Sequence, residues 1–244
     1  MLVFAFLKGS IFVEYNYKLV RASVIKVYNN LIVDVELENG QAEQAFCGAF
    51  EISSICKPHT QLLLKRTSNK KRLVKYNVAF VYTPEGLVFS NPKYNRTLFK
   101  EAFDNQMIPD LRAYTDCRSL RPDDNSNGLD FRLAGPDGKQ AFVFVTSLYL
   151  KKNGCAIFPQ GINFFEMKML EEMDRKRAQG AETYIFMIVP RQDCGKARFV
   201  WNLNPSAAAK MFDAAQNGLK FLCYSCKLQP DNIEISQKLD ILYV

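Results

Sequence analysis

The acidic residues that could bind a metal ion differ in their settings. Asp130 lies between two apolar residues in a β-rich run, and a second β-rich run follows the turn-forming residues 135–138. A carboxylate inside a strand must find a hydrogen-bond partner or a metal ion. Asp123 and Asp124 lie in a polar loop, where paired carboxylates can hold Mg²⁺ but are usually only solvated. Glu166 belongs to the charged face of a predicted helix. Asp130 is therefore the one of these four carboxylates that is predicted inside a strand, and it is the strongest candidate for a metal ligand.

The clearest positive signal is a run of six cations between residues 65 and 75, which we call the basic tip. These cations end one predicted strand and begin the next, so they gather at the tip of a hairpin. Phosphate binding requires a compact cationic surface, because its affinity comes largely from counterion release. We predict that the basic tip contacts nucleic acid and that Tyr76, Tyr82 and Tyr94 offer stacking surfaces; a solvated loop is the alternative. The cations are Lys65, Arg66, Lys70, Lys71, Arg72 and Lys75.

Several catalytic systems lack the residues that they need. His59 is the single histidine, so a Ser-His-Asp or Cys-His nucleophile would depend on it alone. The seven cysteines are odd in number and scattered, and Cys223 and Cys226 have a metal-like spacing without a second pair. We predict that these two cysteines pack within a strand. No glycine-rich phosphate loop occurs, so nucleotide-driven chemistry has no support.

Length and composition favour a globular protein. The 244 residues allow one large domain or two small ones, and 48% apolar residues suffice for a core. No apolar run approaches the roughly 20 residues of a membrane helix, so no membrane partner is expected. We interpret residues 1–8 as a strand rather than a signal peptide, since a basic segment and a cleavage site are missing. With cysteines that form no disulfide framework, this predicts a cytoplasmic location.

Short β-rich runs separated by tight turns fill the first ninety residues. Such a pattern predicts a small barrel or sandwich, with an OB-like β-barrel as one candidate, and a first domain over residues 1–90. The predicted strands cover residues 11–17, 19–28, 31–37, 41–47, 61–66, 73–82 and 86–90.

From residue 91 onward the pattern changes to alternating helices and strands. In the second predicted helix apolar residues recur every three or four positions, and charged residues, Glu172 among them, take the other face. Asn204 is the predicted N-cap of the third helix, and Gly218 lies beyond its end. This order predicts an α/β domain over residues 91–244, with Trp201 in its core. The helices cover residues 92–103, 162–177 and 205–217, and the strands cover residues 183–189, 198–203 and 219–225.

Collinear segments from about residue 18 to the end resemble the sugar fermentation stimulation protein A (SfsA) family. Leu129-Asp130-Phe131 is similar to the family's Ile-Asp-Phe strand, and Phe158-Pro159 also matches. Further similar segments are residues 21–40, which resemble the opening strands, residues 68–72, residues 91–102 and residues 216–224.

This resemblance implies an OB-like barrel followed by a restriction-endonuclease-like α/β domain with a metal-dependent nuclease site of the PD-(D/E)xK type. In such a site an aspartate and a glutamate hold a divalent metal ion, and a lysine orients or activates the attacking water. Asp130 matches the aspartate. Where the family has Glu-Val-Lys-Ser, however, this chain has Phe144 in place of the glutamate and Thr146 in place of the lysine, and the family's upstream glutamate falls near Ser119. The resemblance therefore implies a divergent member with a degenerate nuclease motif.

Three functions remain open. The first is nucleic-acid binding, to DNA rather than RNA. No catalytic residue, no cofactor and no metal ion are expected, and Asp130 would be the metal ligand if a metal ion were bound. The second is an active Mg²⁺-dependent nuclease whose site has migrated. In it, Asp130 would combine with Asp123, Asp124 or Glu166, and Lys151 or Lys152 would replace the missing lysine. The third is a non-catalytic scaffold in a larger assembly, which binds a protein partner or a second copy of the chain.

Overall fold

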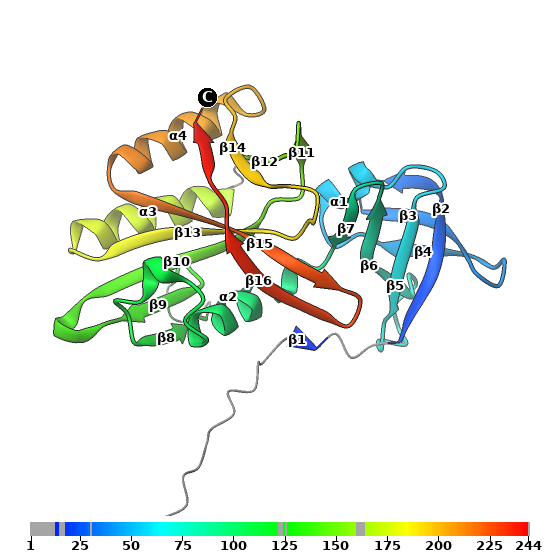
Figure 1. Cartoon of the computed structure of the whole chain (residues 1–244), viewed down its shortest axis with the longest axis horizontal. Helices are drawn as coiled ribbons and strands as arrows, with labels where there is room; N and C mark the ends of the chain where they lie inside the picture. The colour runs from blue at the N-terminus through cyan, green and yellow to red at the C-terminus, as the bar shows by residue number, and fades with distance from the viewer. Residues whose placement is uncertain are drawn as a thin grey trace, which may run out of the picture.

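The computed structural model describes residues 13–14, 18–29, 31–121, 124, 126–159 and 164–243. Two units lie side by side, a β-barrel drawn in blue and cyan and a layered α/β unit drawn in green to red (Figure 1). No helix within these ranges is long and apolar enough to cross a membrane. The strand predicted over residues 1–8 lies outside the described residues.

The first unit is a closed five-stranded barrel with OB-like connectivity. Strands β2, β3 and β4 form an antiparallel meander, and β5 pairs with β2. Strand β6 pairs with β5 and, in parallel, with β4, which closes the ring. The prediction of an OB-like barrel is therefore confirmed. The bounds are β2 Leu19–Asn29, β3 Ile32–Leu37, β4 Ala42–Phe46, β5 Gln61–Arg66 and β6 Tyr76–Thr83, and β7 (Gly86–Phe89) extends the sheet beyond β6.

Two features of the barrel depart from the sequence prediction. A short helix, α1 (Phe50–Ile55), connects β4 to β5 and contributes Ile52 to the barrel core. The strand predicted over residues 73–82 begins at Tyr76 instead, because residues 67–75 form a loop that the Thr67 N–H closes by donating to the Lys75 carbonyl at 2.8 Å. Leu73 in this loop is 96% exposed, so the loop contributes nothing to the apolar interior.

The second unit is built on a seven-stranded sheet in the order β1-β16-β15-β13-β10-β9-β8. Its three central strands are parallel to one another, and antiparallel strands extend both sides. The central strand β13 is buried along almost its whole length, as its continuous apolar run predicts. The bounds are β1 Val13–Glu14, β8 Asp116–Ser119, β9 Phe131–Ala134, β10 Gln140–Ser147, β13 Glu182–Val189, β15 Leu219–Gln229 and β16 Asn232–Lys238.

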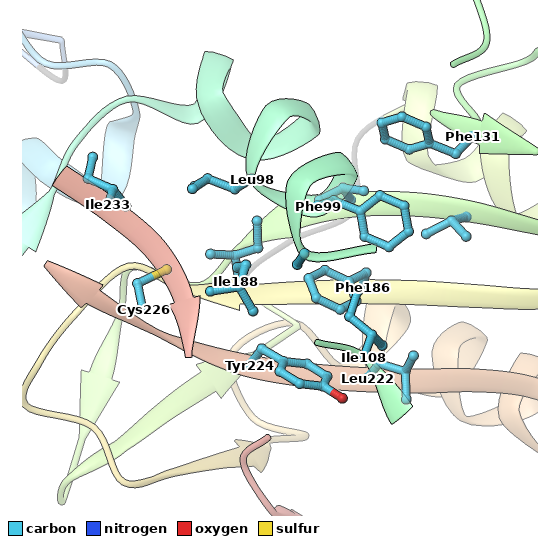
Figure 2. Packing of buried hydrophobic residues seen from close by; sticks show 14 of the residues in the cluster. Leu98, Phe99, Ile108, Phe131, Phe186, Ile188, Leu222, Tyr224, Cys226 and Ile233 are labelled. Atoms are coloured by element: carbon cyan, nitrogen blue, oxygen red, sulfur yellow. The ribbon is translucent and has the colours of Figure 1, made fainter. Parts of the chain in front are cut away.

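Helices cover both faces of this sheet (Figure 1). Helix α2 (Asn95–Asp104), which a 3₁₀ turn over Pro92–Tyr94 precedes, packs on one face, and Figure 2 shows Phe99 of α2 beside Phe131 and Phe186. Helices α3 (Phe164–Ala178) and α4 (Pro205–Gln216) pack on the other face. The predicted N-cap is confirmed, since Asn204 Oδ1 accepts the Ala207 N–H at 3.0 Å.

A small second sheet completes the α/β unit, in the order β11-β12-β14-β17. The sequence predicted β14 over residues 198–203, but it ends at Phe199 because the following residues lead into the cap of α4. Trp201 is 41% exposed and packs against Phe212, so its predicted place in the core is wrong. The bounds are β11 Lys151–Lys152, β12 Cys155–Phe158, β14 Lys196–Phe199 and β17 Ile241–Tyr243.

The two units share part of their core. Leu63, Phe80 and Phe89 of the barrel sheet belong to the same apolar cluster as Phe99 and Phe186 of the α/β unit. Backbone hydrogen bonds also join the units, since the Phe89 N–H donates to the Pro190 carbonyl at 2.9 Å. The described part of the segment predicted as a strand over residues 11–17, β1, pairs with β16 and therefore lies in the α/β sheet rather than in the barrel.

Candidate functional site

Asp130 lies immediately before β9, where the antiparallel ladder between β9 and β10 ends. Its backbone N–H still donates to the Val143 carbonyl at 2.9 Å. Beyond this point the side chain continues the pairing, since Asp130 Oδ2 accepts the Val145 N–H at 2.8 Å. One carboxylate oxygen thus satisfies a backbone donor of β10 that the departing chain leaves without a partner.

The second carboxylate oxygen of Asp130 accepts a hydrogen bond from Arg96, an arginine that no sequence motif predicted. Arg96, in the first turn of α2, donates from Nη1 to Asp130 Oδ1 at 2.8 Å. Its Nη2 contacts Ser119 Oγ and donates to the Leu120 carbonyl at 2.6 Å, and its guanidinium lies 5.2 Å from the Phe131 ring centre. The Arg96 guanidinium therefore neutralises the negative charge of the Asp130 carboxylate. Nothing in the sequence pattern marked Arg96, because its partners lie 23 or more residues away.

Burial raises the pKa of Asp130 above its ordinary value, and this effect outweighs the opposite influence of the Val145 N–H and of Arg96. The Asp130 side chain is 13% exposed, which makes its desolvation large. The carboxylate therefore depends on these two partners for its charge.

Phe144 and Thr146 are half-buried and project from the same face of β10. Phe144 packs against the apolar cluster beneath α3 and α4, and Thr146 pairs in register with Met187 of β13. The Ser119 hydroxyl contacts Arg96. The positions that the resemblance assigns to two acidic ligands and a lysine thus carry an aromatic ring and two hydroxyls.

The described residues that were proposed for a migrated site have partners other than Asp130 or are exposed. Asp124 pairs with Arg118 at 3.2 Å, and the Lys151 ammonium binds Asp193 at 3.0 Å. Asp123 and the side chain of Glu166 lie outside what the structure describes. Lys152 is exposed. Among the described residues, no three His, Cys, Asp or Glu side chains form a group that could hold a metal ion.

The structure also tests the predictions for Cys223 and Cys226 and for Glu172. Cys223 and Cys226 are buried in β15 with free thiols, as predicted, and they belong to the apolar clusters on opposite faces of the sheet. Glu172, predicted on the exposed face of its helix, is buried, because Asn127 donates to its Oε2 at 2.8 Å and Lys176 pairs with it at 3.3 Å.

Replacing Arg96 with methionine is expected to lower the free energy of unfolding by about 1–3 kcal/mol, because it leaves a desolvated carboxylate without its main donor. Urea unfolding of the full chain measures this loss. The double variant Arg96→Met with Asp130→Asn should lose less than the sum of the two single variants, since the two residues share one network. A neutral Arg96→Met variant would contradict the role given to this contact.

The basic tip is the β5–β6 loop together with the strand ends that flank it. Lys70, Lys71 and Lys75 are exposed, as is Arg66, whereas Arg72 is half-buried. The Arg72 guanidinium lies 5.5 Å from the ring centre of Phe46, and its Nη1 donates to Asn77 Oδ1 at 3.1 Å. Arg72 is therefore fixed against the barrel wall and Lys65 is half-buried at the end of β5, whereas Lys70, Lys71 and Lys75 extend into solvent.

The β2–β3 connection and the basic tip both border Phe46. Phe46 pairs in register with Ile32, the first residue of β3, and with Asn77, the second residue of β6. At the end of β2, Tyr28 is 62% exposed and lies 5.9 Å from the Lys26 ammonium. An exposed aromatic ring and a half-buried one thus accompany the cations at this end of the barrel.

Not every cation of the basic tip faces this aromatic surface. Arg66 and Lys75 line a hollow of about 480 Å³ together with Glu38 and Glu43, so two carboxylates lie in the same hollow as these two cations. The tyrosines predicted to stack on bases are also placed differently. Tyr76 is buried in the barrel core.

Tyr94 is half-buried and packs edge-on against Phe89, within the core that the two units share. Tyr82 is 40% exposed but lies near the far end of β6, beside the turn to β7. All three tyrosines were predicted from their proximity along the chain. Tyr28 and Phe46 were not predicted, because they reach this end of the barrel through strand pairing.

An OB-like barrel followed by a mixed α/β sheet that is covered on both faces defines a two-unit architecture. The family described as "Sugar fermentation stimulation protein RE domain" matches residues 93–232, more than half of the chain. The chain therefore belongs to the SfsA family.

Relatives in this family cover nearly the whole chain. The sugar fermentation stimulation protein homologs of Maricaulis maris and Paramagnetospirillum magneticum are 27% and 28% identical over 225 residues, which is 91% of this chain and 96% and 94% of theirs. The solved structure of Pyrococcus furiosus SfsA in complex with Ca²⁺ superposes with a TM-score of 0.78 at 14% identity, over 94% of this chain and 98% of the other. At that identity the superposition shows a shared fold.

Proposed function

We propose that this chain is a nucleic-acid-binding SfsA-like protein that does not cleave its ligand. The binding unit is the OB-like barrel, predicted over residues 1–90 and built from β2 to β6, and the α/β unit, residues 91–244 together with β1, holds a degenerate site of the PD-(D/E)xK type. DNA is the proposed polymer. The binding surface consists of the basic tip, centred on Lys70, Lys71 and Arg72, with Phe46 and Tyr28 beside it.

The position of the basic tip within the barrel carries the binding half of this proposal. OB-folds bind oligonucleotides through the second and third strands and through the loops after the first and fourth. Here those loops are the β2–β3 connection and the β5–β6 loop, and both border Phe46. Cations that track a phosphate backbone beside aromatic rings that stack on bases are the usual elements of single-strand binding.

The position of Arg96 supports the second part of this proposal, that the chain does not cleave nucleic acid. Mg²⁺ is usually bound by one or two carboxylates together with substrate phosphates. Asp130 uses both of its oxygens on Arg96 and on the Val145 N–H. The Pyrococcus furiosus relative was solved with Ca²⁺, whereas in this chain a guanidinium neutralises the one remaining carboxylate. Phe144 has no oxygen to replace the metal-binding glutamate, and Thr146 has no ammonium group to replace the lysine that orients or activates water.

A binding titration with two matched charge reversals tests the surface. The variant Lys70→Glu with Lys71→Glu should weaken binding to a single-stranded DNA oligonucleotide at least tenfold and flatten the slope of log K against log salt by about two. The matched control, Arg66→Glu with Lys75→Glu, should weaken binding less, because Glu38 and Glu43 share the hollow of these cations and lower its positive potential. Fluorescence anisotropy at two salt concentrations measures both variants.

Three outcomes would overturn the proposal. Equal losses in the two variants would assign binding to overall charge rather than to this surface, and unchanged affinity in both would place the nucleic acid elsewhere. The same oligonucleotide incubated with Mg²⁺ or Mn²⁺ should remain intact. Cleavage that Asp130→Ala abolishes would show an active site despite the Arg96 contact.

A further inference from the structure

A hollow of about 540 Å³ lies between the β8–β9–β10 edge of the sheet and the C-terminal end of α3. This edge belongs to the end of the α/β unit that points away from the barrel in Figure 1. Four cations line the hollow, against one carboxylate, Asp124, among the lining residues that the structure describes. This excess of positive charge distinguishes it from the balanced hollow at Arg66 and Lys75. The cations are Arg118, Arg132, Lys139 and Lys176.

Two of these cations stand directly opposite each other. Arg118 of β8 and Arg132 of β9 are register partners in an antiparallel pair, an arrangement in which like charges destabilise a sheet. Asp124 pairs with Arg118 at 3.2 Å. Arg132 Nε is buried, and no group in the described ranges accepts a hydrogen bond from it. A buried donor without an acceptor is costly, and an anion bound between the two arginines would accept this hydrogen bond and reduce their repulsion.

The other walls of the hollow set its size and shape. Phe142 of β10 is the register partner of Arg132 on its other side, and the Lys176 ammonium lies 4.8 Å from the Phe142 ring centre. Lys139 and Lys176 also have acidic partners, at 3.7 and 3.3 Å. Like Arg118, which pairs with Asp124, these lysines therefore contribute only part of their charge, and Arg132 is the cation of the hollow with the least described compensation.

We infer that this hollow binds the phosphate group of a small phosphorylated molecule, with Arg132 and Arg118 as the main donors. Arginine forks match the geometry of phosphate oxygens and bind them through paired hydrogen bonds. The volume falls in the range of small-molecule sites, roughly 300–1,000 Å³, so there is room for more than a bare phosphate. The site is separate from the basic tip and does not depend on nucleic-acid binding.

Thermal unfolding of the full chain with pyrophosphate, at matched ionic strength, tests the inference. At ten times the dissociation constant, pyrophosphate should raise the Tm of the wild type by about 3–6 °C. In Arg132→Gln this shift should fall below about a quarter of the wild-type value. The Tm of that variant without ligand should equal or exceed that of the wild type, because the repulsion from Arg118 is gone.

Control variants and a second ligand, single-stranded DNA, distinguish phosphate binding in the hollow from a general effect of charge and from nucleic-acid binding. Lys227→Gln removes an exposed cation of β15 outside the hollow and should keep the full shift, whereas Lys139→Gln at the hollow should reduce it. Arg132→Gln should bind single-stranded DNA as the wild type does. A wild type that pyrophosphate does not stabilise, or an unchanged shift in Arg132→Gln, would overturn the inference. Parallel loss of DNA binding in Arg132→Gln would do the same, by making the hollow part of the nucleic-acid surface.

Discussion

Replacing Asp193 with asparagine is expected to lower the free energy of unfolding by about 3–5 kcal/mol, because it leaves a buried arginine without its counter-charge. The Arg191 side chain is 5% exposed, and its Nε and Nη2 each donate to an Asp193 oxygen at 2.9 Å. Lys151 binds the same carboxylate at 3.0 Å and pairs with Glu85 of the β6–β7 turn at 3.5 Å. This network therefore joins the α/β unit to the barrel.

The matched control is Lys151→Met, which removes the outer cation and keeps the arginine pair. Its expected loss is about 1 kcal/mol, because the Arg191–Asp193 pair stays intact. Urea unfolding at neutral pH ranks the two variants. If Asp193→Asn cost no more than Lys151→Met, the buried pair would not be a principal contact between the units.

Asp193 also makes the free energy of unfolding depend on pH in the acid range. Burial alone would raise the pKa of Asp193, but the hydrogen bonds and charges of Arg191 and Lys151 more than offset it and hold the pKa at about 2. Since this lies below the ordinary value of 3.8, the stabilisation is complete above pH 4 and is lost as the pH falls toward 2. The loss amounts to about 2 kcal/mol. Asp193→Asn should abolish this part of the acid dependence.

Phe99→Ala is expected to cost about 3–5 kcal/mol, because it removes a large ring from a closely packed interior. Phe99 is fully buried, with ring centres of Phe131 and Phe186 at 4.8 and 4.9 Å (Figure 2). The control is Phe103→Ala on the same helix, whose ring is partly buried and 6.4 Å from Phe99, and it should cost less than half as much. Because Arg96 lies on α2, Phe99→Ala should also loosen its contact with Asp130. A cost below that of Phe103→Ala would show that α2 does not depend on this ring.

The elements that the sequence predicted best are those specified by local chemistry. The strand over residues 61–66 matches β5 at both ends, and Asn204 and Gly218 delimit α4 as capping rules require. Helix α1 escaped notice because its six residues are too few to show a helical period. Glu172 was misplaced because its burial depends on Asn127, 45 residues away.

The candidate site was predictable only in part, for a related reason. A resemblance between segments identified Asp130, Phe144 and Thr146, since each occupies one position in a linear motif. Arg96 and the Arg191–Asp193 pair take their meaning from contacts that only the folded chain creates. The aromatic residues beside the basic tip were likewise misassigned, because pairing between strands rather than proximity along the chain brings Phe46 next to Arg72.

The apolar cluster that runs from Phe80 and Phe89 into Phe99 and Phe186 opposes hinge motion between the barrel and the α/β unit, because such motion would expose buried rings. A ligand held at the basic tip would keep one orientation toward the α/β sheet, without a swinging motion to bring it closer. Spectroscopic distance measurements between labels on the two units should therefore give a single narrow distribution, the same with and without DNA. Under the proposed function, the chain would select nucleic acids whose shape already fits the angle between the barrel and the sheet.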